Sequence, residues 1–316
     1  MTQTHSIDHD ISDRTVLVTG GAGFIGSHIA DALVDDNTVR VLDDLSSGRR
    51  SHVPDGADLV VGDVRDEETL AEVMTGVDTV FHEAAVVSVE HSVDAPIETD
   101  DTNTGATLRV LEAARKEDAR VVIASSAAIY GHPEYVPVDE DHPTTATSPY
   151  GVTKIAGDQY ARLYESLYGL PTVALRYFNA YGPRQRGGAY SGVISRFVEQ
   201  ALAGDPITIN GDGKQTRDFV HVDDIVRANL LAATTDSVGE AFNVGTGETV
   251  TIRELAELIR DVTDSDSPIE HTDPREGDVR HSCADVTAAR KGLGFEPSIT
   301  LADGLKTVPG VQQREK

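Results

Sequence analysis

The first half of the chain alternates short runs of β-branched residues with helical patterns of apolar residues. Between the runs, apolar residues recur three or four positions apart, as at Ile25, Ile29 and Leu33, which is the spacing of one helix face. This alternation predicts a parallel sheet that helices bury on both faces, in a doubly wound α/β fold. The predicted strands cover residues 15–19, 38–43, 58–61, 78–81 and 120–124.

The pattern continues with one long helix and then loosens. Ser148 and Pro149 are typical of a helix start, so a helix is predicted over 148–168, with a strand at 172–176. Residues 179–195 are rich in Gly, Pro, Arg and Tyr, which favours ligand-contacting loops. Two further helices are predicted, one at 223–233 and one beginning with the capping box Thr251 to Glu254. We expect a flexible N-terminal tail at 1–12, a nucleotide-binding domain at 13–178 with later returns near 215–245, and mainly a smaller C-terminal substrate-binding lobe at 179–310.

Charge and cysteine content exclude several classes of protein. The 316 residues contain 27 Lys plus Arg and 53 Asp plus Glu, a net charge of −26, which disfavours nucleic-acid and membrane-surface binding. Cys283 is the only cysteine, so neither a disulfide framework nor a multi-thiolate site is possible, and no metal site is predicted. No apolar signal core or membrane span is visible, which favours a cytoplasmic protein. The excess of Asp and the scarcity of Lys fit a hypothesis of a salt-rich cytoplasm.

A glycine-rich segment follows the first predicted strand. Gly20, Gly23 and Gly26, with Phe24 and Ile25 between them, permit a tight turn whose backbone N–H groups approach a pyrophosphate at a helix N-terminus. This predicts a Rossmann-type dinucleotide site.

Further cofactor contacts are expected where the next strands end. Asp43 ends the second strand, where its carboxylate can accept both ribose hydroxyls of NAD and would repel the extra phosphate of NADP, although Arg49 and Arg50 lie nearby. The other expected contacts follow the third and fourth strands at Asp63, Val64, Ala84 and Ala85.

Three side chains form a candidate catalytic group. Tyr150 and Lys154 are one turn apart on the predicted helix, and an adjacent ammonium lowers the pKa of a phenol, which makes it a usable general base. Ser126 ends the fifth strand at the carboxyl edge of the sheet, where α/β folds bind ligands. It can hydrogen-bond the same substrate oxygen as Tyr150.

Seven motifs together resemble the extended short-chain dehydrogenase/reductase family, most closely its nucleotide-sugar 4-epimerases of the UDP-glucose 4-epimerase type. They are TGGAGFIGSH, SSAAIYG, YGVTK, LRYFNAYGPRQ, GDGKQTRDFVHVDD, NVGTGE and PREGDVRHSCAD. The resemblance implies tightly held NAD and a catalytic triad of Ser126, Tyr150 and Lys154. In such an enzyme Tyr150 takes the proton of the sugar 4-hydroxyl while hydride leaves carbon 4, and hydride then returns to the other face of the keto-sugar.

The same resemblance implies a set of substrate contacts. Arg217 and Arg275 match the arginines that bind the diphosphate of the nucleotide sugar, Asn179 matches another diphosphate contact, and Asp278 matches a position near the nucleotide ribose. Ser282 matches a position where a small residue admits an N-acetylated sugar, so UDP-GlcNAc and UDP-glucose both remain open. At Asn210 many relatives place an aromatic residue against the base, which leaves uridine and thymidine open.

Related enzymes and a non-enzyme stay as alternatives. Dehydratases carry an Asp-Glu pair just after the serine, and decarboxylases carry a glutamate there, whereas this chain has Ala127 and Ala128. This favours an epimerase over a dehydratase or decarboxylase and leaves a uronate 4-epimerase open. A catalytically silent NAD-sensing scaffold is the rival of another class. The family also implies a homodimer, through the helices around 107–117 and 148–168.

Overall fold

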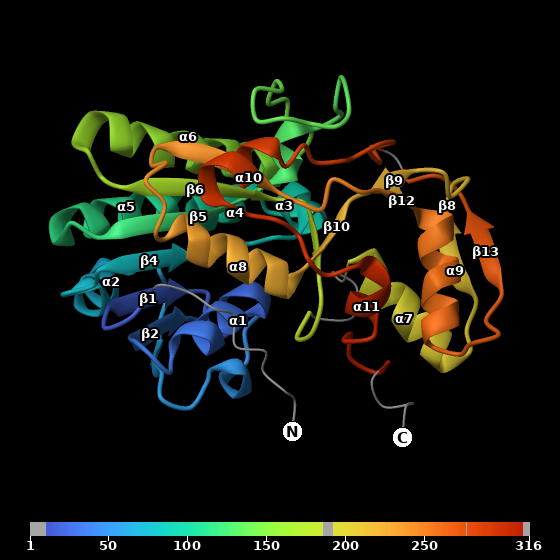
Figure 1. The fold of residues 1–316 in the computed structure, drawn as a ribbon, viewed down its shortest axis with the longest axis horizontal. Helices are drawn as coiled ribbons and strands as arrows, with labels where there is room; N and C mark the ends of the chain where they lie inside the picture. The colour runs from blue at the N-terminus through green and yellow to red at the C-terminus, as the bar shows by residue number, and fades with distance from the viewer. Residues whose placement is uncertain (1–10, 186–191, 276, 312–316) are drawn as a thin grey trace.

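The centre of the protein is a parallel sheet of seven strands (Figure 1). The computed structural model describes residues 11–185, 192–275 and 277–311. The predicted doubly wound α/β fold is confirmed. Across the sheet the strands are β11 (Glu240–Val244), β6 (Thr172–Tyr177), β5 (Arg120–Ser126), β4 (Thr79–His82), β1 (Thr15–Thr19), β2 (Thr38–Asp43) and β3 (Asp58–Val61).

The strand order reverses beside β1. This strand pairs with β2 on one side and with β4 on the other, so that Thr19 lies between Leu42 and His82. The connection after β1 leads to β2 on one side, and the connection after β4 leads to β5 on the other side. The two connections therefore diverge at the carboxyl edge of the sheet, which creates a crevice there. Ligands of open α/β sheets bind at such a point, so the topology itself locates the candidate site.

Helices cover both faces of the sheet. One face packs against α1 (Phe24–Leu33), α8 (Val222–Ala232) and α10 (Thr287–Leu293), and the other against α2 (Glu67–Met74), α5 (Ala106–Glu117) and α6 (Pro149–Tyr168). Side chains alternate between the two cores along each strand, since Phe81 contacts the first core and Val80 the second. This explains why apolar residues occupy successive positions in the middle of strands such as β1 and β5.

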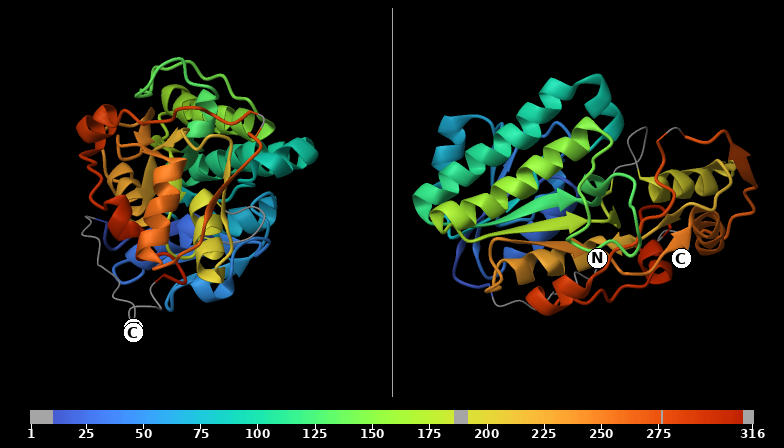
Figure 2. Two further views of the ribbon diagram at one scale, coloured as in Figure 1. Left: turned by 90° about the vertical axis from the view of Figure 1, so that its right-hand side faces the viewer. Right: turned by 90° about the horizontal axis from the view of Figure 1, so that it is seen from above.

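A smaller lobe lies beyond the carboxyl edge of the sheet (Figure 2, right). Its core is a separate cluster that includes Phe197, Leu255 and Ile259, all fully buried. The lobe contains α7 (Val193–Ala203), β8 (Ile207–Asn210), α9 (Ile252–Val262), β13 (Ile269–Thr272) and α11 (Leu301–Leu305). Two small sheets join it to the first lobe, namely β7 (Asn179–Tyr181) with β10 (Phe219–His221), and β9 (Thr216–Arg217) with β12 (Val250–Thr251).

Several boundaries differ from the expectation. β5 runs on to Ser126 and β6 to Tyr177, because these residues pair with each other at the end of the sheet. The segment expected as loops contains β7 and the start of α7, while residues 186–191 lie outside the described part. Ile11, which the sequence assigned to the N-terminal tail, is 1% exposed in the core, and residues 1–10 lie outside the described part.

The remaining elements are short turns of helix. They are η1 (Arg50–His52), α3 (Val89–Asp94), α4 (Pro96–Asp100), the π-helical turn η2 (Asp101–Gly105) and η3 (Ala127–Tyr130). Within the described ranges, none of the helices has the length and apolar character that crossing a bilayer requires.

Candidate active site

The glycine loop joins β1 to α1 with almost no room for side chains. Gly20 has a φ of +68°, which favours glycine, and a Cβ there would lie 2.7 Å from the backbone nitrogen of Ala84. A Cβ on Gly26 would collide with the carbonyl oxygen of Gly20 and lie 2.9 Å from Gly21 Cα. Gly23 is the N-cap of α1, with no side chain over the helix end. The backbone N–H groups at this helix N-terminus are therefore open to an anion.

Asp43 lies beside this loop, as expected. Its Oδ2 accepts a hydrogen bond from Ala22 N at 2.9 Å, and its Oδ1 accepts one from Leu45 N at 2.8 Å. The side chain is 7% exposed, and burial raises the pKa of its carboxyl group, while the two backbone hydrogen bonds oppose the rise. A carboxylate fixed at the end of β2 fits the ribose hydroxyls of a dinucleotide, and it disfavours a phosphate at the same place.

The residues after β3 and β4 lie along the same edge. Asp63 forms an ion pair with Arg65 at 2.6 Å, which lowers the pKa of its carboxyl group. Val64 is buried, and Ala84 and Ala85 are half-buried next to the loop. These positions suit a cofactor that crosses the sheet edge, and their contact with one stays a prediction.

The structure brings the predicted catalytic side chains together. Ser148 caps α6 by accepting a hydrogen bond from Gly151 N at 3.1 Å, and this begins the helix that carries Tyr150 and Lys154 on one face. Lys154 Nζ donates to the carbonyl oxygen of Ala124 at 2.8 Å and lies 5.9 Å from the centroid of the Tyr150 ring. The Ser126 side chain hydrogen-bonds Tyr150.

The protonation of this group differs from the expectation in one respect. Burial raises the pKa of Tyr150, and the hydrogen bond from Ser126 only opposes the rise. Burial also lowers the pKa of Lys154. For these side chains by themselves the pKa of Tyr150 is therefore raised rather than lowered, because the loss of hydration at an 8% exposed phenol outweighs the hydrogen bond from Ser126 and the charge of Glu83 adds to the rise.

The predicted substrate residues gather around the small lobe. Arg217 forms an ion pair with Asp278 at 2.5 Å, so two of them are in direct contact. Asn179 Nδ2 donates to the carbonyl oxygen of Asp218 at 2.8 Å. Arg275 is exposed, and Ser282 is half-buried on the strand-like segment that bonds Thr216.

The sequence did not indicate two charged residues of the site, one near Arg275 and one near Lys154. Arg196 on α7 is half-buried, interacts electrostatically with Arg275, and has a buried Nε without a hydrogen-bond partner among the described residues. Glu83 follows β4 and interacts with Lys154. A charged residue inside the apolar HEAAVV segment was the available signal for Glu83, whereas Arg196 has the spacing of an ordinary surface residue.

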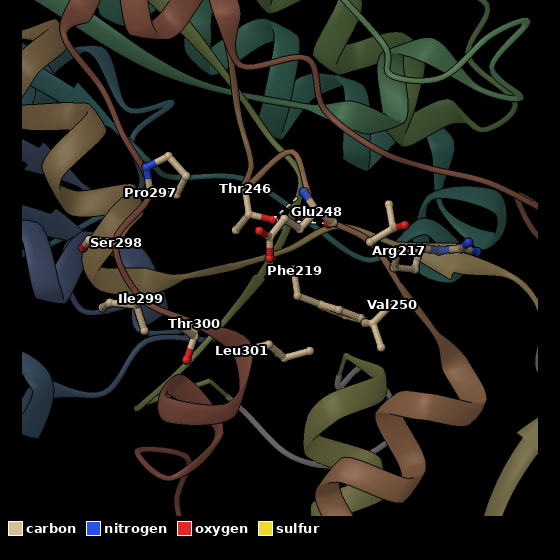
Figure 3. A pocket seen from close by; sticks show the side chains of 11 residues that line it. Arg217, Phe219, Thr246, Glu248, Val250, Pro297, Ser298, Ile299, Thr300 and Leu301 are labelled. Atoms are coloured by element: carbon tan, nitrogen blue, oxygen red, sulfur yellow. Dashed lines mark hydrogen bonds between the residues drawn. The ribbon is translucent and has the colours of Figure 1, made fainter.

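A pocket of about 210 Å³ opens next to Arg217, between β9, β12 and the start of α11 (Figure 3). Glu248 and Arg217 supply its charged lining, while Phe219 and Val250 supply apolar surface. Of the predicted substrate residues only Arg217 lines it, so this pocket is separate from the group around Tyr150. In the described residues no three His, Cys, Asp or Glu side chains are grouped as a metal ion would require.

A nucleotide-binding sheet with a serine, a tyrosine and a lysine at its carboxyl edge defines the short-chain dehydrogenase type of enzyme. The chain belongs to the NAD dependent epimerase/dehydratase family, which it matches over residues 16–245. NAD is thus its cofactor, and the glycine loop and Asp43 have the shape and charge to hold one.

Several known proteins are similar to this chain over almost its whole length. A putative UDP-glucose 4-epimerase of Methanocaldococcus jannaschii is 41% identical over 297 residues, covering 93% of this chain and 96% of the relative. The solved UDP-N-acetylglucosamine 4-epimerase of Methanobrevibacter ruminantium, in complex with UDP-N-acetylmuramic acid, has a TM-score of 0.92 at 37% identity, covering 96% and 98%. UDP-glucose 4-epimerase of Thermotoga maritima with UDP-glucose has a TM-score of 0.91 at 39% identity, covering 95% and 99%.

Proposed function

We propose that the protein is an NAD-dependent nucleotide-sugar 4-epimerase. The observation that carries the proposal is the contact of Ser126, Tyr150 and Lys154 at the sheet edge, with alanines where a dehydratase needs acids. When bound, NAD would supply the acceptor for the hydride of carbon 4 of the sugar and the donor for its return to the opposite face.

The side chains of this chain supply the proton transfer. Tyr150 removes the proton of the 4-hydroxyl as a general base and gives it back when the new configuration forms. Ser126 donates a hydrogen bond to the same oxygen and orients it. The Lys154 ammonium favours the phenolate of Tyr150, which counts most in a site that excludes water.

Local cations bind the anionic substrate in spite of the net charge of −26. In this proposal Arg217, Arg275 and Asn179 contact the diphosphate, and Asp278 contacts the ribose of the nucleotide. Bidentate guanidinium groups fit phosphate oxygens well. Asp278 already holds Arg217, so the diphosphate competes with this ion pair for the guanidinium.

Selection between possible sugars depends on Ser282, in the smaller C-terminal lobe. Ser282 is small and half-buried, which leaves room for UDP-GlcNAc as well as UDP-glucose. Kinetics of the wild type and Ser282→Tyr on both nucleotides test this. Unchanged discrimination would remove Ser282 from the explanation.

Ala127 and Ala128 distinguish the rival reactions. They form η3 directly after Ser126, and Ala128 N donates to Ser126 Oγ at 3.2 Å. A dehydratase or decarboxylase would need a carboxyl group from another place, whereas a uronate 4-epimerase would not.

Product analysis tests the function directly. The purified protein is incubated with UDP-glucose, UDP-GlcNAc, UDP-glucuronate and dTDP-glucose, and products are identified by NMR and mass. Epimerisation leaves the mass unchanged, whereas loss of water or carbon dioxide does not. Tyr150→Phe is the matched inactive control, since it retains the ring and removes the hydroxyl. Absence of NAD and of turnover would favour the scaffold alternative.

The proposal includes a homodimer. Exposed apolar side chains lie on the outer side of α6, where Val152 is 55% and Leu167 61% exposed, and Ile97 on α4 is 80% exposed. Apolar surface of this kind favours association with a second copy. Light scattering of the wild type and of Ile97→Glu with Leu167→Glu tests it, and a monomeric wild type would contradict it.

The acidity fits a cytoplasm of high salt. Dispersed carboxylates repel one another at low ionic strength, and salt near 1 M reduces the screening length to about 3 Å. We expect the unfolding midpoint to rise with KCl concentration. Equal stability at low and high salt would contradict this.

A further inference from the structure

A carboxyl group without a role in the proposed reaction lies next to the catalytic side chains. Glu83 directly follows β4 at the carboxyl edge of the sheet. Its Oε1 accepts a hydrogen bond from the hydroxyl of Tyr177 at 2.8 Å, and that hydroxyl accepts one from Asn229 Nδ2 at 2.8 Å. Side chains of β6 and α8 thus hold the carboxyl group in one orientation.

The strand register puts Glu83 at the level of Lys154. Strands β4 and β5 are paired up to His82 and Ile123, so Glu83 and Ala124 occupy the next position on each strand. The carbonyl oxygen of Ala124 accepts the hydrogen bond of Lys154 Nζ at 2.8 Å. The ammonium and the carboxyl group therefore share one end of the sheet.

Glu83 and Lys154 are half-buried, and several residues around them are poorly hydrated. Ala124 and Tyr150 are 8% exposed and Tyr177 is 7% exposed. Charges in such surroundings interact more strongly than charges in water. Burial raises the pKa of Glu83, and the hydrogen bond from Tyr177 and the charge of Lys154 oppose this rise.

The groups that face Glu83 come from the elements packed around it. Helix α6 contributes Lys154 and Tyr150, and β6 contributes Tyr177, whose pKa burial raises far above its ordinary value. Helix α8 contributes only the neutral amide of Asn229. Lys154 is thus the only positive charge among these groups.

The neighbour of Glu83 on its own strand is neutral. His82 points to the other face of the sheet, where its ring contacts the hydroxyls of Thr19 at 2.7 Å and Thr107 at 3.1 Å. Burial lowers the pKa of His82 to about 3, so this ring carries no charge near neutral pH.

We propose that Glu83 is a positioning residue whose carboxylate sets the pH range in which Tyr150, assisted by Lys154, exchanges a proton with substrate. This inference rests on the proposed function for the roles of the pair. An ionised carboxylate favours the ammonium of Lys154 and disfavours the phenolate of Tyr150, so it raises the pKa of both groups. Activity needs the phenolate and the ammonium together. The carboxylate therefore moves the whole range toward higher pH.

Glu83→Gln tests the proposal, because glutamine retains an oxygen that accepts from Tyr177 and removes the charge. In the profile of kcat/KM against pH, we expect the acidic and the basic limb both to move about one unit toward lower pH. A second readout needs no turnover. The tyrosinate absorbance that is lost in Tyr150→Phe reports the ionisation of Tyr150, and it should appear at lower pH in Glu83→Gln.

Glu112→Gln is the matched control. Glu112 accepts a hydrogen bond from the Tyr164 hydroxyl at 2.8 Å, which is the same pair at the same distance, but near the far end of α6 from Tyr150. Its removal should leave both limbs in place. If Glu83→Gln does not fold, Tyr177→Phe removes the hydrogen bond that favours the ionised carboxyl, and a smaller shift in the same direction is expected.

Two results would overturn the proposal. One is a lower rate with unmoved limbs and an unmoved Tyr150 titration, which would assign Glu83 a purely structural role. The other is a shift of one limb alone. A protein that turns over no sugar nucleotide would refute the proposed function, whereas the Tyr150 titration of Glu83→Gln would still test the charge effect by itself.

Discussion

A buried ion pair links α6, the helix that carries Tyr150 and Lys154, to strand β6 of the sheet. Its removal should lower the free energy of unfolding by a predictable amount. Asp158 on α6 lies one turn beyond Lys154, and Arg176 lies on β6; both side chains are 2% exposed. Arg176 Nε donates to Asp158 Oδ2 at 2.8 Å and Nη2 donates to Oδ1 at 3.0 Å. Tyr130 Oη, at 3.0 Å, and the carbonyl oxygen of Glu140, at 2.9 Å, accept the bonds of Nη1.

Asp158→Asn removes the negative charge with almost no change of shape. The guanidinium of Arg176 then stays buried with hydrogen bonds to neutral acceptors only and with the more distant charge of the Glu140 carboxyl group, and breaking a buried pair costs about 3–5 kcal/mol. The free energy of unfolding should fall by about that amount. The buried alternative Asp158→Leu with Arg176→Met removes both charges, and it should recover most of the loss because no charge remains to be solvated.

Urea unfolding followed by circular dichroism measures the change. The slope of the transition should stay the same while its midpoint falls, which indicates a change in stability rather than in compactness. Asp212→Asn is the matched control: Asp212 makes the same two-bond contact with Arg280, at 2.7 and 2.9 Å, but both side chains are about half exposed. Its midpoint should stay nearly unchanged. The reasoning is refuted if the two substitutions shift the midpoint equally.

Three further predictions concern single residues. Between pH 7 and pH 5 the free energy of unfolding should fall by about 2 kcal/mol through His82, because its pKa of about 3 in the folded protein lies below the unfolded value of 6.5 and protons therefore favour the unfolded chain. The urea midpoint measured against pH tests this. An equally steep pH dependence in His82→Asn would contradict it. Burial raises the pKa of Cys283 to about 11, so the native thiol should react with DTNB at pH 8 far more slowly than the urea-unfolded thiol, and equal rates would contradict this. Gly26→Ala should abolish the retention of NAD, measured by cofactor release on denaturation, since its Cβ collides with the glycine loop. Gly157→Ala, whose Cβ would make an ordinary contact with Thr107 at 3.7 Å, should retain it.

The local order of the first half could be predicted from sequence because local forces decide it. Predicted strands at 15–19, 38–43 and 58–61 agree with β1, β2 and β3 to the residue, and the Ser148 cap and the Thr251–Glu254 capping box are formed as expected. Apolar periodicity and capping chemistry act over a few residues, so a single sequence displays them.

The site could be predicted only where motifs mark it. Tyr150 and Lys154 are neighbours on one helix turn, and Ser126 ends a recognisable strand, so their proximity followed from the fold class. Arg196 and Glu83 were missed, because nothing local indicates that a helix residue of the second lobe lies near Arg275 or that Glu83 lies near Lys154.

The sequence by itself determined the sheet, its glycine loop and the types of side chain that perform the chemistry. Only the tertiary structure decided in which direction the pKa values of those side chains shift. Burial raises the pKa of Tyr150 and lowers that of Lys154, and Glu83, 71 positions earlier, opposes the change at the lysine. Hydration and charge act through space, so a pKa depends on which distant residues exclude water from a group, and residue order does not display that.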